Sequence, residues 1–161
     1  MPNLTRKVLV YVVQGGKLLV FRHVAHPDAG IQVPAGTIEP AESAHDAARR
    51  EVLEESGLAV RIDRLIGSTE VSMAPFGRDE VQERWVFLAF PETNAPATWR
   101  HWERNASGGG EYEFEFFWHP IGAPIELAGG QGELIEPAKR ALAATWRRRR
   151  GDEPWRRRGR A

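Results

Sequence analysis

A cluster of acidic residues within one predicted helix places the strongest constraint on this chain. Glu51, Glu54 and Glu55 are spaced at i, i+3 and i+4, and these positions share one face of a helix. Ser43 suits the N-cap of that helix, and Gly57 suits the left-handed position that ends it. Three carboxylates so close repel one another unless a cation lies between them, and oxygen ligands select hard ions such as Mg²⁺ or Mn²⁺. The spacing on its own is more typical of a solvated acidic face than of a metal site.

The neighbouring residues describe how such a helix would be held. Ala44, Ala48 and Val52 form an apolar line beside the acids, which predicts that the helix packs on a core and presents its acids at a fixed place. Gly36 lies in the loop before the helix, where a glycine lets backbone carbonyls approach a metal or a phosphate closely.

The stretch Gly36–Leu58 resembles the signature of the Nudix hydrolase family, and every specified position of that signature matches. The matching residues are Gly36, Glu42, Arg50, Glu51, Val52, Glu54, Glu55, Gly57 and Leu58. At residue frequencies of roughly one in fifteen, seven fixed identities coincide by chance about once in 10⁸ windows. The signature therefore outweighs the reading of a solvated acidic face, and the rest of the chain is compatible with one domain of this family.

The resemblance implies a divalent-metal-dependent hydrolase that cleaves a phosphoanhydride bond in a nucleoside diphosphate linked to another group. Glu51, Glu54 and Glu55 would be the metal ligands, joined by the backbone carbonyl of Gly36 or its neighbour. Glu51 is also a candidate for the general base. The expected cofactor is Mg²⁺ or Mn²⁺, which neutralises phosphate charge and supplies hydroxide near neutral pH.

Two further signature residues have supporting roles in this interpretation. Arg50 would orient the ligand carboxylates, and Glu42 would pair with Arg50 or bind a second ion. A plain structural ion pair between the two is compatible with the same sequence.

Members of the family often use a further glutamate from a distant strand or loop, and Glu115 resembles it in placement, three residues before Trp118. Glu111 and Glu113 lie on the same face of the predicted strand and are weaker candidates. All three acids are also what the solvent face of an amphipathic strand would contain.

Residues that would contact the substrate are harder to assign. Arg22 could contact a phosphate or a base and Phe76 could stack on a base, although surface arginines and core aromatics are commoner explanations. Pro75 and the run Val33–Gly36 are similar to ADP-ribose pyrophosphatases, but nucleoside triphosphates and other dinucleotides fit almost as well. A non-catalytic domain that binds a nucleotide or RNA is the remaining alternative.

The pattern of elements predicts an α+β fold, an α/β/α sandwich with a mixed sheet between helices, as the resemblance also implies. A second helix is expected near 134–148, and the segment around Trp99 and Trp102 is ambiguous. The expected strands are 7–13 and 17–22, which form a hairpin, and 31–33, 59–62, 65–71, 82–90 and 111–118.

Composition places further limits on the protein. There are no cysteines, which excludes disulfides and thiolate metal sites, and no run of transmembrane length, so a cytoplasmic protein is expected. One domain is expected over 1–146, followed by a disordered tail over 147–161 that carries eight arginines and two acids. The tail is a possible nucleic-acid contact, but the remainder of the chain carries a net charge of −6 and would repel a polyanion. A monomer and a homodimer are both open.

Overall fold

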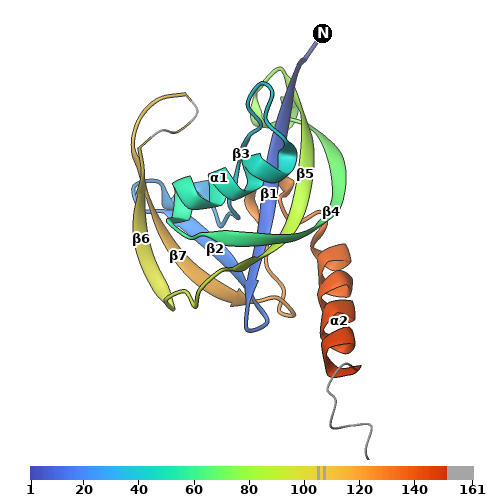
Figure 1. Cartoon of the computed structure of the whole chain (residues 1–161). Coiled ribbons are helices and arrows are strands. Elements are labelled where there is room, and N and C mark those ends of the chain that lie inside the picture. The colour runs from blue at the N-terminus through green and yellow to red at the C-terminus, as the bar shows by residue number, and fades with distance from the viewer. Residues whose placement is uncertain (105, 107, 152–161) are drawn as a thin grey trace, which may run out of the picture.

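A mixed β-sheet forms the centre of the molecule (Figure 1). The computed structural model describes residues 1–104, 106 and 108–151. Within this part of the chain the strand order is β4-β5-β1-β2-β7-β6, with β3 beside β1. The strands are β1 (Asn3–Gln14), β2 (Lys17–His23), β3 (Ala35–Thr37), β4 (Val60–Ser72), β5 (Glu80–Pro91), β6 (Thr98–Glu103) and β7 (Tyr112–Pro120). The α-helices are α1 (Ala44–Ser56) and α2 (Ile135–Gly151).

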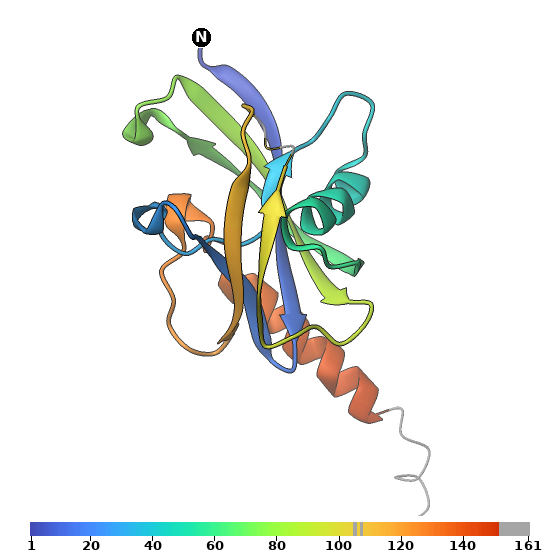
Figure 2. The same cartoon turned by 90° about the vertical axis from the view of Figure 1, so that its left-hand side faces the viewer.

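The sheet divides into two halves because β1 and β2 separate soon after the turn that joins them. They pair only at Val13–Leu18 and Gln14–Lys17, beside that turn. Beyond it, β1 runs parallel to β5, whereas β2 pairs antiparallel with β7. Figure 2 shows the two halves diverging from the turn. The hairpin over 7–22 is confirmed, but it is open for most of its length.

Helix α1 packs across both halves of the sheet. Ala47, Ala48 and Val52 are fully buried against apolar residues of β1, β2, β5 and β7. The ends of the helix are those that the sequence predicts: the Ser43 hydroxyl accepts from the Asp46 N–H at 3.0 Å, and Gly57 is left-handed with φ 76°. Local capping and one apolar line therefore place the acidic face of α1.

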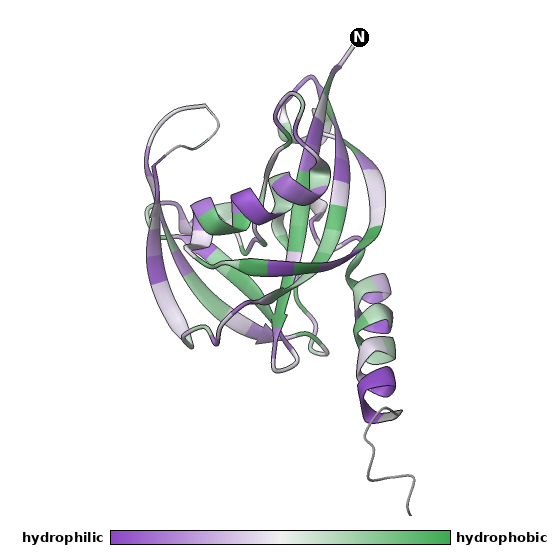
Figure 3. Cartoon of the chain, in the orientation of Figure 1, coloured by the Kyte–Doolittle hydropathy of each residue, from purple (hydrophilic) through white to green (hydrophobic). Residues whose placement is uncertain are grey.

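Helix α2 covers the opposite face of the sheet. Ala138 and Leu142 pack there with Leu9, Tyr11 and Val86. The expected mixed sheet between helices is thus confirmed, and Figure 3 shows the hydrophobic residues concentrated in the strands that the helices cover. None of the helices in the described part of the chain has the length and apolar character needed to cross a membrane.

Three segments differ from their expected structure. The run 31–33 is not a strand: Gln32 makes one bridge to Phe21, and the Val33 N–H donates to the Gln131 side chain at 2.9 Å instead of to a neighbouring strand. The stretches 59–62 and 65–71 form one strand, β4, in which shifts of register absorb the irregularity between them. The ambiguous segment around Trp99 is strand β6, at the edge of the sheet.

Helix α2 also extends further than expected. It continues to Gly151, so Arg147–Arg150 are helical although the sequence predicts a disordered tail from residue 147. Figure 3 shows this end of α2 as strongly hydrophilic. The rest of the predicted tail, residues 152–161, lies outside the described residues.

Candidate metal and catalytic site

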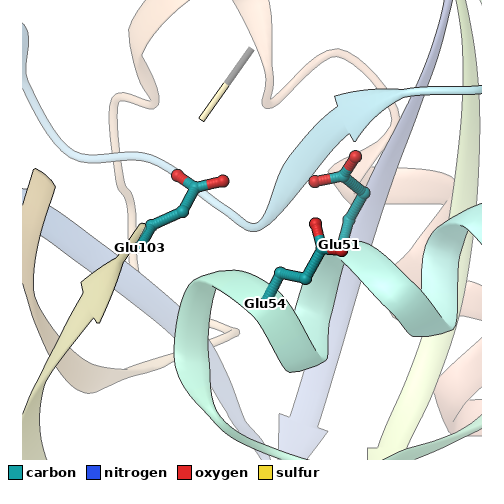
Figure 4. A group of neighbouring side chains, drawn as sticks. All are labelled: Glu51, Glu54 and Glu103. Carbon is teal, nitrogen blue, oxygen red and sulfur yellow. The ribbon is translucent and has the colours of Figure 1, made fainter. Parts of the chain in front are cut away.

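Three glutamates from two elements converge at one end of α1. Glu51 and Glu54 come from the helix and Glu103 from the end of β6, and each offers a carboxylate oxygen within 4.8 Å of the others (Figure 4). Glu51 and Glu103 are buried, with 5% and 9% of their surface exposed. The group lines a cavity of about 390 Å³ together with Thr37 and Arg50. Burial and crowding of like charges make this cluster an acceptor for a cation.

Strand alternation explains why Glu103 joins the cluster. Along β6, Trp99, His101 and Glu103 are paired with Phe116, Phe114 and Tyr112 of β7, whose side chains belong to the core beneath α1. Every second residue of a strand points to the same face, so Glu103 faces the helix.

Strand β6 is also bonded to the last turn of α1. The Trp99 indole N–H donates to the Ser56 carbonyl at 2.8 Å, and the Nε2 of His101 lies 3.1 Å from the Glu54 carbonyl oxygen. Carbonyls in the last turn of a helix have no partner within the helix, so these contacts complete its C-terminus. They also fix the position of Glu103 relative to Glu54.

Arg50 connects the signature residues to one another. Its Nη1 donates to Glu51 at 2.7 Å and to Glu54 at 3.2 Å, and its Nε and Nη2 donate to the two oxygens of Glu42 at 2.8 and 2.9 Å. The bond to Arg50 lowers the pKa of Glu42, and the bond to Glu42 raises the pKa of Arg50. A further bond to the Thr37 carbonyl at 2.9 Å joins this network to β3. Arg50 therefore holds two cluster carboxylates in a defined orientation.

Two of the helix acids are buried where ionisation is unfavourable. Desolvation raises the pKa of Glu51 to about 7 despite its bonds to Arg50. Desolvation also raises the pKa of Glu55 well above its usual range, although its Oε1 accepts from the Ala35 N–H at 3.3 Å. Within the described residues, the Oε2 of Glu55 is buried without a hydrogen-bond partner. An orphaned buried oxygen beside two more carboxylates fits a site that a hard cation completes.

Gly36 is needed at the edge of this site. Its backbone lies so close to Glu51 that a Cβ atom at this position would clash with the carboxylate of that residue. The glycine therefore permits close approach of the Glu51 carboxylate, while the approach of a metal or a phosphate to this backbone stays a prediction. Gly36 also borders a second cavity, of about 280 Å³, on the face of the sheet opposite to α1.

The other sequence candidates lie away from the cluster. Glu115 points to the opposite face of β7, where it pairs with Arg100 at 3.4 Å and with Arg22 at 3.9 Å. Glu113 also pairs with Arg100, at 3.5 Å, and Phe76 is 56% exposed in the turn between β4 and β5. The structure thus brings together Glu51, Glu54 and Arg50. Glu115 and the predicted ligand Glu55 are not in the group of carboxylates within 4.8 Å of one another.

Sequence reasoning missed Glu103 as a site residue. The signal for it is the alternation of Trp99, His101 and Glu103, but it becomes visible only once the segment is assigned as a strand. The sequence favours Glu115 because of its placement three residues before Trp118, but the structure places Glu115 on the face of the sheet away from the cluster.

Comparisons with known proteins agree with the signature. A family model described as NUDIX domain matches residues 3–140. The chain is 30% identical over 110 residues to the putative 8-oxo-dGTP diphosphatase YtkD of Bacillus subtilis (strain 168), covering 62% of this chain and 65% of that protein. It is 34% identical over 67 residues to the NAD-capped RNA hydrolase NudC of Salmonella heidelberg (strain SL476), covering 42% of this chain and 26% of that protein. The chain thus matches less than two thirds of the length of either relative.

Solved structures share the fold. The MutT NUDIX hydrolase from Burkholderia pseudomallei superposes with a TM-score of 0.61 at 21% identity, covering 84% of this chain and 98% of that one. The MutT protein from Methanosarcina mazei Go1 gives a TM-score of 0.63 at 17% identity, covering 88% and 96%. Because the family model matches most of the chain and the chain contains the complete signature at Gly36–Leu58, this protein belongs to the NUDIX family.

Proposed function

We propose that the protein hydrolyses a phosphoanhydride bond in a nucleoside diphosphate linked to another group, with Mg²⁺ or Mn²⁺ bound at the acidic cluster. The observation that carries this proposal is the convergence of Glu51, Glu54 and Glu103 within 4.8 Å. Arg50 compensates two of these three carboxylates only in part, so a further cation among them would stabilise the folded protein. The unpartnered oxygen of Glu55 behind the cluster supports the same conclusion.

We assign the residues of the acidic cluster and its surroundings separate roles in metal binding and positioning. Glu51 and Glu54 of the three-carboxylate group would hold the divalent cation, with the backbone of Gly36 beside them. Glu55 is not in that group and stays a predicted ligand. When bound, such a cation lowers the pKa of water and neutralises phosphate charge. Arg50 keeps the carboxylates of Glu51 and Glu54 in place through bonds of 2.7 and 3.2 Å, so little reorganisation is needed during the reaction.

Glu103 takes the place of the further glutamate that the sequence assigns to Glu115, and we assign to it the general-base role for which the sequence offers Glu51. In the described part of the chain Glu103 makes no ion pair, whereas Glu51 and Glu54 are both bonded to Arg50. Its carboxylate therefore has lone pairs available to accept a proton from the attacking water. Glu115 is engaged with Arg22 and Arg100 on the other face of the sheet.

The substrate class is a nucleotide with a pyrophosphate linkage. The curated relatives are named a putative 8-oxo-dGTP diphosphatase and an NAD-capped RNA hydrolase, which supports nucleotide substrates in general. ADP-ribose-like compounds and nucleoside triphosphates both contain a bond of the required type.

A phosphate-release screen with Mg²⁺ and then Mn²⁺ tests the proposal. The panel contains nucleoside triphosphates, ADP-ribose, dinucleoside polyphosphates, NADH and nucleotide sugars, each also tested with EDTA. We expect Glu54→Gln to lower turnover by more than about a hundredfold while the protein stays folded, because it removes a ligand charge. Glu136→Gln, at an exposed acid of α2, is the matched control and should retain full turnover.

Two outcomes would count against the proposal. Near-normal turnover of Glu54→Gln would refute the assignment of this residue as a ligand. No metal-dependent turnover across the whole panel would favour a NUDIX domain that binds nucleotides without hydrolysing them.

A further inference from the structure

The second cavity beside Gly36 is rich in basic groups. It measures about 280 Å³ and lies on the face of the sheet opposite to α1. Lys7, Arg78 and Arg84 line it, whereas no acidic side chain of the described residues does. Leu9, Met73 and the backbone around Gly129 complete its walls. Arg78 is paired with Glu80 at 3.3 Å, so Lys7 and Arg84 are the two lining cations without a paired carboxylate among the described residues.

Arg84 is the most unusual of these groups. It sits in the middle of the core strand β5 with only 5% of its surface exposed. Its Nε donates to Gln82 at 3.0 Å, its Nη1 to the Gly129 carbonyl at 2.6 Å, and its Nη2 to the Met73 sulfur at 3.7 Å. In the described part of the chain no carboxylate lies within ion-pair distance of it. Glu133 and Glu80 act on it only from beyond ion-pair distance, so this buried charge has neutral hydrogen-bond acceptors but no paired carboxylate.

Lys7 is the second cation of the cavity. It is half-buried on β1, and its Nζ donates to the Thr37 hydroxyl at 2.7 Å. Within the described residues it too has no carboxylate at ion-pair distance. Desolvation lowers the pKa of both Lys7 and Arg84, in agreement with charges that protein groups compensate only in part.

The cavity is adjacent to the proposed catalytic site. Strand β3 forms the boundary: Ala35 and Gly36 line the cavity, Gly36 lies against Glu51, and the Thr37 carbonyl accepts from Arg50. A substrate bound at the acidic cluster could therefore extend past β3 toward Arg84.

We infer that this cavity binds a phosphoryl group of the substrate that is not part of the hydrolysed linkage. The inference rests on the proposed hydrolase function and narrows it: the substrate would carry a phosphate ester in addition to its pyrophosphate bridge. Arg84, Lys7 and Arg78 would surround that group, with Arg84 as its central contact.

The donors of the cavity fit a phosphoryl group better than a neutral base edge. A guanidinium has five N–H donors, of which Arg84 uses three, and an ammonium has three, of which Lys7 uses one. A phosphoryl group offers only acceptor oxygens and a compensating negative charge, whereas a guanine edge combines acceptors with donors and is neutral.

Binding of inorganic phosphate to the full chain in EDTA tests this inference without relying on turnover. Without metal, the acidic cluster repels phosphate, so binding reports on the cavity. We expect Arg84→Met and Lys7→Met each to weaken phosphate binding by about ten- to a hundredfold in calorimetry, the range for one charged hydrogen bond. Arg61→Met, at an exposed arginine of β4 outside the cavity, should bind as the wild type does.

Substrate kinetics give the second readout. For a hydrolysed substrate that carries a phosphate ester, Lys7→Met should raise KM with little change in kcat, and the same substrate without that phosphate should show no such difference. Lys7→Met keeps the test decisive if Arg84→Met does not fold.

Equal phosphate affinity in all variants, or none in the wild type, would overturn the inference. Binding of guanosine that Arg84→Met abolishes and phosphate does not displace would overturn it in favour of base recognition. Loss of phosphate binding in both cavity variants, without metal-dependent turnover of any substrate, would support the anion site and refute only the hydrolase.

Discussion

The side of a strand on which a glutamate lies decides its role in this protein. Glu103 and Glu115 both lie on the strands beside α1, but on opposite faces of the sheet. Glu103 faces Glu51 and Glu54, whereas Glu115 is paired with Arg22 and Arg100. Side chains alternate between the two faces of a strand, and this alternation decides whether a glutamate is a candidate proton acceptor or part of a surface ion pair.

We predict that Glu103→Gln lowers kcat by about a hundredfold or more, the usual effect of losing a general base. Glu115→Gln is the matched variant, and its kcat should stay within about twofold of the wild type because it loses only a partly exposed ion pair. Both are measured with the substrate found in the screen, and circular dichroism checks folding. The reverse ranking, a large loss in Glu115→Gln and a small one in Glu103→Gln, would restore the assignment made from the sequence.

Among the elements, β6 matters because it is attached to the end of α1. The Trp99 ring stacks on Phe116 with centroids 5.2 Å apart, while its N–H caps the Ser56 carbonyl. Trp102 lies on the same strand with 48% of its surface exposed and makes neither contact. Comparing substitutions of the two tryptophans therefore separates the effect of bonding β6 to α1 from the effect of losing an indole ring on β6.

We predict that Trp99→Phe lowers the free energy of unfolding by about 1–2 kcal/mol, because it leaves the Ser56 carbonyl without its partner. It should also lower kcat, because Glu103 loses its fixed distance from Glu54. Urea unfolding and steady-state kinetics measure the two effects. Trp102→Phe is the control and should change neither; a kcat for Trp99→Phe equal to that of the wild type would show that β6 does not position the site.

Elements with local signals were predictable from the sequence, and those that depend on distant partners were not. Helix α1 follows from Ser43, Gly57 and its apolar line, which are all within the segment itself. The stretch 31–33 is apolar enough for a strand, but the Gln131 side chain, far along the chain, takes the Val33 N–H. Strand β6 is defined by its pairing with β7 and by its bonds to α1, none of which a single segment reveals.

The same distinction applies to the candidate site. The signature contains Arg50, Glu51 and Glu54 within one turn or so of helix, so sequence spacing is enough to bring them together. Glu103 and Arg84 reach their positions only through the order of strands in the sheet. For Arg84 the sequence gives no distinguishing signal, because it lies beside Gln82 and Glu83 in the polar first half of β5.

For the molecule as a whole, the buried acids couple stability to both pH and metal. Desolvation raises the pKa of Glu51 to about 7 and also raises the pKa values of Glu55 and Glu103, compared with 4.5 for the ordinary side chain. Above pH 4.5 the folded protein without metal therefore binds more protons than the unfolded chain. Its free energy of unfolding then falls as the pH rises. The lowered pKa values of Glu42 and Glu80 act in the opposite direction, but their contribution is complete above pH 4.5. The lowered pKa of the single residue His23 also opposes the trend, up to about its ordinary value of 6.5, against three carboxyl groups with raised pKa values.

We therefore predict that, in EDTA, the Tm falls by several degrees as the pH is raised from about 5 to about 8, given roughly 2–4 °C per kcal/mol for a domain of this size. Mg²⁺ or Mn²⁺ should raise the Tm more at the higher pH, because the cation binds ionised carboxylates and competes with protons for them. Calorimetric scans with EDTA and with metal measure both effects. Glu55→Gln should make the Tm in EDTA less dependent on pH. It removes a buried carboxyl group, one oxygen of which has no hydrogen-bond partner among the described residues. A metal-induced rise in Tm that is the same at both pH values would show that protons and metal do not share these carboxylates, and that the cation binds elsewhere on the protein.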